Sequence, residues 1–144
     1  MSDQIPVGAI HHLRLTVTDL ARSRAFYTGL LGFHVVVESP KPGDPGFAEA
    51  FKLLFGGIVM ARGGLLLGLR PVAPAGDTFE ENRVGLDHVS FGVPGRADLE
   101  DAIRRFDAAG VPHGGIHEIP SFGICVLPFR DPDNVQLEFT APLA

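Results

Sequence analysis

Three side chains in the sequence could bind a metal ion if the fold brought them together: His12, His88 and Glu138. Two imidazoles and one carboxylate on separate strands, with coordination positions left open, suit Fe(II), Mn, Ni or Zn. The same residue types are also common on the solvent-facing side of an ordinary antiparallel sheet. The pattern alone leaves both interpretations open.

The segment around His12 predicts a strand followed by a helix. Apolar and polar residues alternate from Ile10 to Thr18, as in a half-buried strand, with Leu13, Leu15 and Val17 on one face and His12, Arg14 and Thr16 on the other. Asp19 is a suitable N-cap for a helix that ends at Gly32. Further on, "FHVVVES" predicts a strand, "FAEAFKLLF" a short helix, and "GIVMAR" and "GLLLGLR" a hairpin.

The second half of the chain repeats this order of elements. His88 stands 88 − 12 = 76 residues after His12 and again precedes an alternating run, "LDHVSFGV". A helix, "RADLEDAIRRFDAAG", follows, and then three candidate strands, "VPHGGIHEI", "GICVLPFR" and "VQLEFTA", with the turn "DPDN" before the last. Such an internal duplication usually pairs its units, because neither buries its apolar face alone.

We therefore predict an α+β fold in a single domain over residues 1–144. It contains one βαβββ module at about residues 9–70, a connector at 71–84 and a second module at about 85–142, which form a cup-shaped mixed sheet with helices on the outer face. If the helices cover the apolar faces, the polar faces line a common concavity. The residues expected there are His12, Arg14, Thr16, His88, Ser90, Gln136, Glu138 and Thr140.

The composition of the chain argues against nucleic acids and membranes as binding partners. A formal charge of −5 leaves no basic surface for nucleic acid, and no run of Lys or Arg suggests an anionic membrane. No uncharged apolar run approaches the ~18 residues that a membrane span needs. Cys125 is the one cysteine, and the N-terminus lacks the features of a secretion signal, so we expect a cytoplasmic protein.

Three stretches, "HHLRLTVTDLARSRAFYTGLLGF", "LDHVSFGV" and "FRDPDNVQLEF", resemble the vicinal oxygen chelate superfamily. This superfamily includes glyoxalase I, fosfomycin-resistance thiol transferases, extradiol dioxygenases and bleomycin-binding proteins. The resemblance runs from Ile10 to Pro142 and implies a glyoxalase-like fold, a divalent metal ion held by His12, His88 and Glu138, and a homodimer. His12 is preferred to His11 because the family's ligand directly precedes the alternating run. The metal's identity, and whether the cup forms within one chain or across a dimer, stay open.

The sequence also departs from its relatives. Gly68 stands where glyoxalase I has a fourth ligand, so the usual proton-transferring carboxylate is missing. Arg14 and Pro128 replace a threonine and a tyrosine of the fosfomycin transferases. We expect a metal-dependent glyoxalase- or dioxygenase-like enzyme, either a lyase, a thiol transferase or a dioxygenase, whose small substrate chelates the metal through two oxygens. The alternative is a non-catalytic binding or sequestration protein of the bleomycin-resistance type.

Arg14, Ser90 and Gln136 are the candidate substrate-binding residues. A guanidinium at Arg14 could pair with a carboxylate, phosphonate or enolate, or else form a salt bridge with Glu138. Cys125 is expected to be a buried, inert thiol. The sequence assigns no role to His113, His117 or Arg83, and no catalytic residue beyond the ligands.

Overall fold

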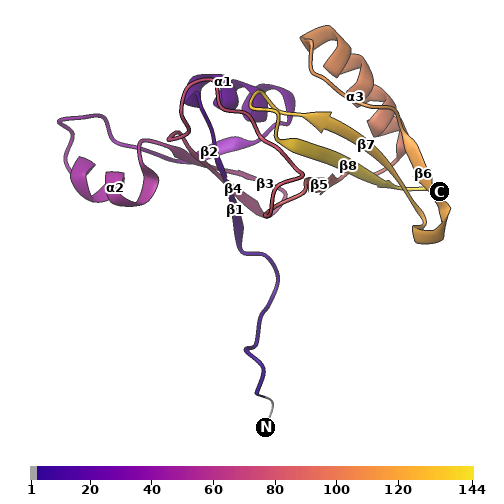
Figure 1. The fold of residues 1–144 in the computed structure, drawn as a ribbon, viewed down its shortest axis with the longest axis horizontal. Coiled ribbons are helices and arrows are strands. Elements are labelled where there is room, and N and C mark those ends of the chain that lie inside the picture. The colour runs from indigo at the N-terminus through magenta and orange to yellow at the C-terminus, as the bar shows by residue number, and fades with distance from the viewer. Residues whose placement is uncertain (1–2) are drawn as a thin grey trace. The chain divides into compact units, whose positions relative to one another are not determined.

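The computed structural model describes residues 3–144, which divide into two compact units, one ending at Pro74 and the other beginning at Ala75. Each unit contains one four-stranded sheet and at least one helix (Figure 1). None of the helices in this part of the chain is long and apolar enough to span a bilayer.

The first unit is built around the strand that begins at His12. Its sheet has the order β1-β4-β3-β2, with β1 parallel to β4 and the other neighbours antiparallel. In chain order the elements are β1 (His12–Thr16), α1 (Leu20–Ala25), the π-helix η1 (Phe26–Leu30), β2 (His34–Glu38), α2 (Phe47–Leu54), β3 (Ile58–Arg62) and β4 (Leu65–Arg70).

The alternation along β1 has the expected outcome. Leu15 and Val17 are buried, whereas His12, Arg14 and Thr16 are exposed. The Asp19 side chain accepts a hydrogen bond from the Arg22 backbone N–H and caps α1, as predicted. The helix does not stay regular to Gly32, because its second half widens into the π-helix.

The second unit repeats the order of the first. Its sheet is β5-β8-β7-β6, again with one parallel pair, β5 with β8. The elements are β5 (Val89–Gly92), α3 (Arg96–Ala109), β6 (His117–Ile119), the 3₁₀-helix η2 (Pro120–Phe122), β7 (Ile124–Arg130) and β8 (Gln136–Pro142). Of the predicted strand "VPHGGIHEI", only His117–Ile119 is a strand, and His113 forms an isolated bridge with Phe129.

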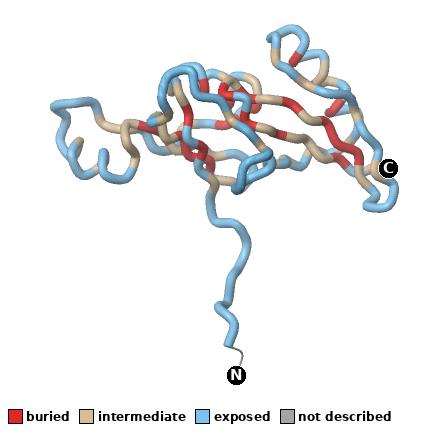
Figure 2. Tube along the Cα trace, in the orientation of Figure 1, coloured by how far each residue is buried: buried red, intermediate tan, exposed pale blue. Residues whose placement is uncertain are grey.

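Helix α3 covers one face of this second sheet. Phe106 is 2% exposed, and its ring lies 4.7 Å from that of Phe129 on β7 and 5.9 Å from that of Phe139 on β8, centroid to centroid. Both strands contain buried residues (Figure 2), which are Cys125, Val126, Leu127 and Phe129 on β7 and Leu137 and Ala141 on β8. The two βαβββ-like modules therefore confirm the predicted fold.

Candidate metal centre

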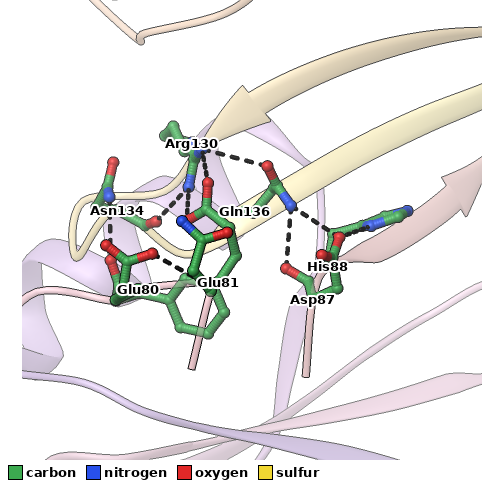
Figure 3. A network of polar contacts seen from close by, with 9 residues as sticks. Glu80, Glu81, Asp87, His88, Arg130, Asn134 and Gln136 are labelled. Atoms are coloured by element: carbon green, nitrogen blue, oxygen red, sulfur yellow. Dashed lines mark hydrogen bonds and ion pairs between the residues drawn. The ribbon is translucent and has the colours of Figure 1, made fainter. Parts of the chain in front are cut away.

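His88 lies immediately before β5, and its ring is oriented by the preceding residue. Its Nδ1 lies 2.6 Å from Asp87 Oδ1 (Figure 3). An ionised carboxylate has no proton to donate, so Nδ1 is the donor. In the neutral imidazole, Nε2 then carries the free lone pair that a metal ion needs.

Glu138 is the acidic group next to that lone pair. In the parallel pair of β5 and β8, Ser90 aligns with Glu138, which brings the carboxylate to the same face as His88. His88 Nε2 and Glu138 Oε1 are 3.7 Å apart, too far for a hydrogen bond. With His88 neutral, two acceptors thus face each other across a gap that two metal–ligand bonds of about 2.1 Å can span.

A chain of hydrogen bonds supports Asp87 from behind. Gln136 Nε2 donates to Asp87 Oδ1 at 3.0 Å and to its backbone carbonyl at 3.1 Å. Gln136 Oε1 in turn accepts a hydrogen bond from Arg130 Nη2. The two terminal nitrogens of Arg130, Nη2 and Nη1, also donate to the Glu81 carboxylate, at 2.6 and 3.0 Å respectively (Figure 3). Glu81 therefore links the connector to β7 and β8 by hydrogen bonds. The same chain of hydrogen bonds runs through Arg130, Gln136 and Asp87 to His88.

The paired charges at Arg130 also change the acidity of this network. The hydrogen bonds from Arg130, followed by a backbone hydrogen bond, lower the pKa of Glu81 from 4.5 to about 2. The hydrogen bond with Glu81 in turn raises the pKa of Arg130 above its ordinary value. The pair stays ionised across the physiological range and holds Gln136 in one orientation.

The Glu138 oxygen that faces His88 also accepts a hydrogen bond from a hydroxyl group of its own strand. Thr140 Oγ1 donates to Glu138 Oε1 at 3.3 Å, and Ser90 Oγ lies 2.5 Å from Thr140 Oγ1. Ser90 and Gln136 are both residues that the sequence predicts to bind substrate. Both belong to the face that carries Glu138, and the amide of Gln136 is hydrogen-bonded at both ends.

The first unit carries His12 and Arg14. His12 begins β1, and its Nδ1 lies 2.8 Å from Nδ1 of His11. Arg14 Nη2 donates to the Leu53 carbonyl at 2.7 Å. The predicted ligands are thus distributed with His12 on one unit and with His88 and Glu138 on the other.

The contact with Arg14 explains why a glycine fits at position 68. It aligns with Arg14 across β1 and β4, and a Cβ built at Gly68 would lie 3.1 Å from Arg14 Cγ. The aliphatic part of Arg14 therefore lies against the backbone of Gly68, the position that the resemblance aligns with a fourth ligand. A Cβ there would require the Arg14 side chain to shift by a few tenths of an ångström.

Among residues 3–144, no group of three or more His, Cys, Asp and Glu side chains is arranged to hold a metal ion. The second unit nevertheless supplies a fitting pair. The donors are an imidazole nitrogen and a carboxylate oxygen, and each has its own hydrogen-bond support, which is the usual environment of metal ligands. A third ligand has to come from elsewhere.

The remaining side chains named from the sequence lie outside the His88–Glu138 pair. Cys125 is buried, as predicted, with its Sγ 3.8 Å from the Pro142 carbonyl. His113 lies in hydrogen-bonding distance of Asp107 and of the Gly114 carbonyl, and these contacts, led by Asp107, raise its pKa. His117 lies exposed on β6, and Arg83 is exposed in the connector.

The sequence placed Thr140 on the face of Glu138, but it did not predict the roles of Asp87 or of the Arg130–Glu81 pair. Asp87 could have been found, because it directly precedes the candidate ligand and is a hydrogen-bond acceptor. The Arg130–Glu81 pair joins residues 49 positions apart and has no local signal.

Comparison with known proteins agrees with this architecture. The model of the Glyoxalase/Bleomycin resistance protein/Dioxygenase superfamily matches residues 9–139. The uncharacterized protein YwkD of Bacillus subtilis is 30% identical over 130 residues, which cover 90% of this chain and 94% of YwkD.

Solved structures give the same result. A glyoxylase/bleomycin resistance protein/dioxygenase domain from Frankia is 30% identical, with a TM-score of 0.71 over 94% of this chain and 93% of the other. A FosX fosfomycin resistance protein from Listeria monocytogenes, crystallised as a point mutant with Mn(II) and a dihydroxypropylphosphonic acid, is 20% identical with the same TM-score, over 94% and 93% of the two chains. The chain belongs to the Glyoxalase/Bleomycin resistance protein/Dioxygenase superfamily, known also as the vicinal oxygen chelate superfamily.

Proposed function

We propose that this chain is a divalent-metal-dependent enzyme whose small substrate chelates the metal through two oxygens. The observation that carries the proposal is the pair formed by His88 Nε2 and Glu138 Oε1, which face each other at 3.7 Å. A cation between these two groups would satisfy both. The Mn(II) in the FosX structure supports a divalent ion for this fold.

The proposed ligands are His12, His88 and Glu138. A metal ion bound there supplies Lewis acidity, which stabilises negative charge on the substrate oxygens. The protein's own residues fix the ligands: Asp87 keeps the proton of His88 on Nδ1, and Thr140 donates to Glu138. Arg14, Ser90 and Gln136 are proposed to orient the substrate. Because Gln136 already binds Arg130 and Asp87, we assign it the additional task of holding Asp87.

Metal analysis tests the proposal. Tag-free protein, reconstituted and then dialysed, is expected to hold close to one equivalent of Zn²⁺ or Mn²⁺, and His88→Ala and Glu138→Gln are expected to lose it. His117→Ala is the matched control, because it removes an exposed histidine of the same unit. If wild type binds no metal, the proposal fails and the non-catalytic binding function takes its place. That function would not need the proton-transferring carboxylate that Gly68 lacks.

We also propose that the protein acts as a homodimer, which raises the question of which copy provides His12. Mixing His12→Ala with His88→Ala protein under conditions that exchange subunits separates the alternatives. Ligands shared between copies predict recovery of about one site in each mixed dimer, because one of its two sites is intact. Ligands from a single copy predict no recovery.

A further inference from the structure

Two arginines of the first unit converge on one phenylalanine ring. The guanidinium carbon of Arg70, on β4, lies 4.0 Å from the centroid of the Phe55 ring, and that of Arg14, on β1, lies 5.9 Å from it. Arg14 and Arg70 lie on the same face of the sheet, because β1 aligns Arg14 with Gly68 and Thr16 with Arg70. This is also the face to which His12 belongs.

Neither arginine is neutralised within its unit. No carboxylate in the described part of the first unit, residues 3–74, forms an ion pair with Arg14 or Arg70, and Arg70 Nε is buried without a hydrogen-bond partner. Elsewhere in the unit, Arg24 pairs with Glu38 and Lys52 with Glu49. The two guanidinium groups near this ring therefore carry positive charge with no carboxylate partner in the described part of the unit, and a bound oxyanion would neutralise it.

The distribution of charge over the chain favours an anion at this place. Residues up to Pro74 carry seven Lys and Arg against five Asp and Glu, a formal charge of +2, whereas the second unit has five against twelve, a formal charge of −7. The acidic character of the whole protein thus comes from the second unit alone. The first unit is the one whose electrostatic potential can attract an oxyanion.

The two guanidinium groups are also held in place. Stacking on Phe55 orients Arg70, and the hydrogen bond to the Leu53 carbonyl orients Arg14. Phe55 itself closes α2 in a left-handed backbone conformation, with φ of 52°. Gly68 leaves the space in which the Arg14 side chain crosses β4. Arginine forks fixed in this way are suited to bidentate pairing with carboxylate or phosphate.

We propose that Arg14, Arg70 and Phe55 form a binding site for the oxyanion group of a small molecule, a carboxylate or a phosphoryl or phosphonyl group. The proposal deepens the proposed function, since it gives the substrate a negative charge. Its test uses metal-free protein, so the anion site and the metal centre can fail independently.

The experiment is a titration of chelator-treated protein with inorganic phosphate, methylphosphonate and malonate at constant ionic strength, followed by the ¹⁵Nε signals of the arginines. The Arg70 and Arg14 signals are expected to shift together and to saturate. The anion that binds most tightly identifies the source of the oxyanion. Arg70→Met is expected to weaken binding about tenfold or more, because it removes a charge-assisted fork.

Arg62→Met is the matched control, because Arg62 lies on β3 of the same unit, where it donates to the Gly32 carbonyl. It removes the same charge and is expected to change the affinity by less than about threefold. Arg70→Lys keeps the charge but not the fork, and we expect an intermediate affinity. Equal losses in Arg62→Met and Arg70→Met would overturn the proposal. So would wild-type titrations in which neither arginine signal shifts, a result that requires no variant to fold.

Discussion

Removing the Asp87 carboxylate tests the link between the hydrogen-bond network and the metal centre. In Asp87→Ala, His88 Nδ1 loses its 2.6 Å acceptor, and Gln136 Nε2 loses one of its two. Loss of such an outer partner typically weakens metal binding 10- to 100-fold. The side chain of Asp87 is 70% exposed, so water partly replaces it. We therefore expect about a tenfold loss, which corresponds to about 1.4 kcal/mol.

The assay is a competition titration of Zn²⁺ against a chromophoric chelator. Glu100→Ala is the control, because it removes an exposed acid from α3 of the same unit. The ring can be followed separately, since ¹⁵N chemical shifts of the metal-free protein report which nitrogen of His88 carries the proton. Asp87→Ala protein that binds Zn²⁺ as tightly as wild type, with the His88 tautomer unchanged, would refute the positioning role.

Three further predictions concern packing and protonation. Gly68→Glu is expected to destabilise the protein by about 1–3 kcal/mol in urea denaturation, because its Cβ approaches Arg14 Cγ at 3.1 Å; adding Arg14→Ala should recover part of the loss, and no recovery would contradict this cause. Phe106→Ala should cost about 3–5 kcal/mol, since the ring packs on two others; a loss below that of Ile103→Ala would be inconsistent with this packing. The pKa of His113 is raised in the folded protein, so protonated His113 contributes fully to the free energy of unfolding below the unfolded pKa of about 6.5. This contribution disappears as the pH rises through the folded pKa, and the difference in urea midpoint between wild type and His113→Gln should therefore narrow from about pH 5.5 to about pH 8.5. A difference that stays constant over this range would contradict the prediction.

The sequence predicted those parts of the site that depend on local periodicity. Alternation along β5 and β8 put His88 and Glu138 on one face, and the parallel register of Ser90 with Glu138 confirms this for the second unit. The turn "DPDN" was also predicted correctly. Asp131 accepts hydrogen bonds from the backbone of Asp133 and Val135 and so closes the hairpin between β7 and β8.

Contacts that depend on distant register could not be predicted. Arg70 reaches Phe55 because β4 returns parallel to β1 and because α2 ends next to it, and neither feature has a local signal. The contact between Gly68 and Arg14 could not be predicted either, because it also depends on the pairing of β1 with β4. The sequence showed only an absent ligand, whereas the structure shows the Arg14 side chain lying over that glycine.

The central claim is that the imidazole of His88 and the carboxylate of Glu138 bind one metal ion. A crystal structure of the Zn²⁺-loaded protein, with anomalous scattering measured at the zinc edge, tests it most directly. We predict one strong anomalous peak about 2.0–2.2 Å from His88 Nε2 and from a Glu138 carboxylate oxygen, with His12 as the third protein ligand. Zinc bound at other residues, or a peak coordinated by only one of His88 and Glu138, would contradict the account.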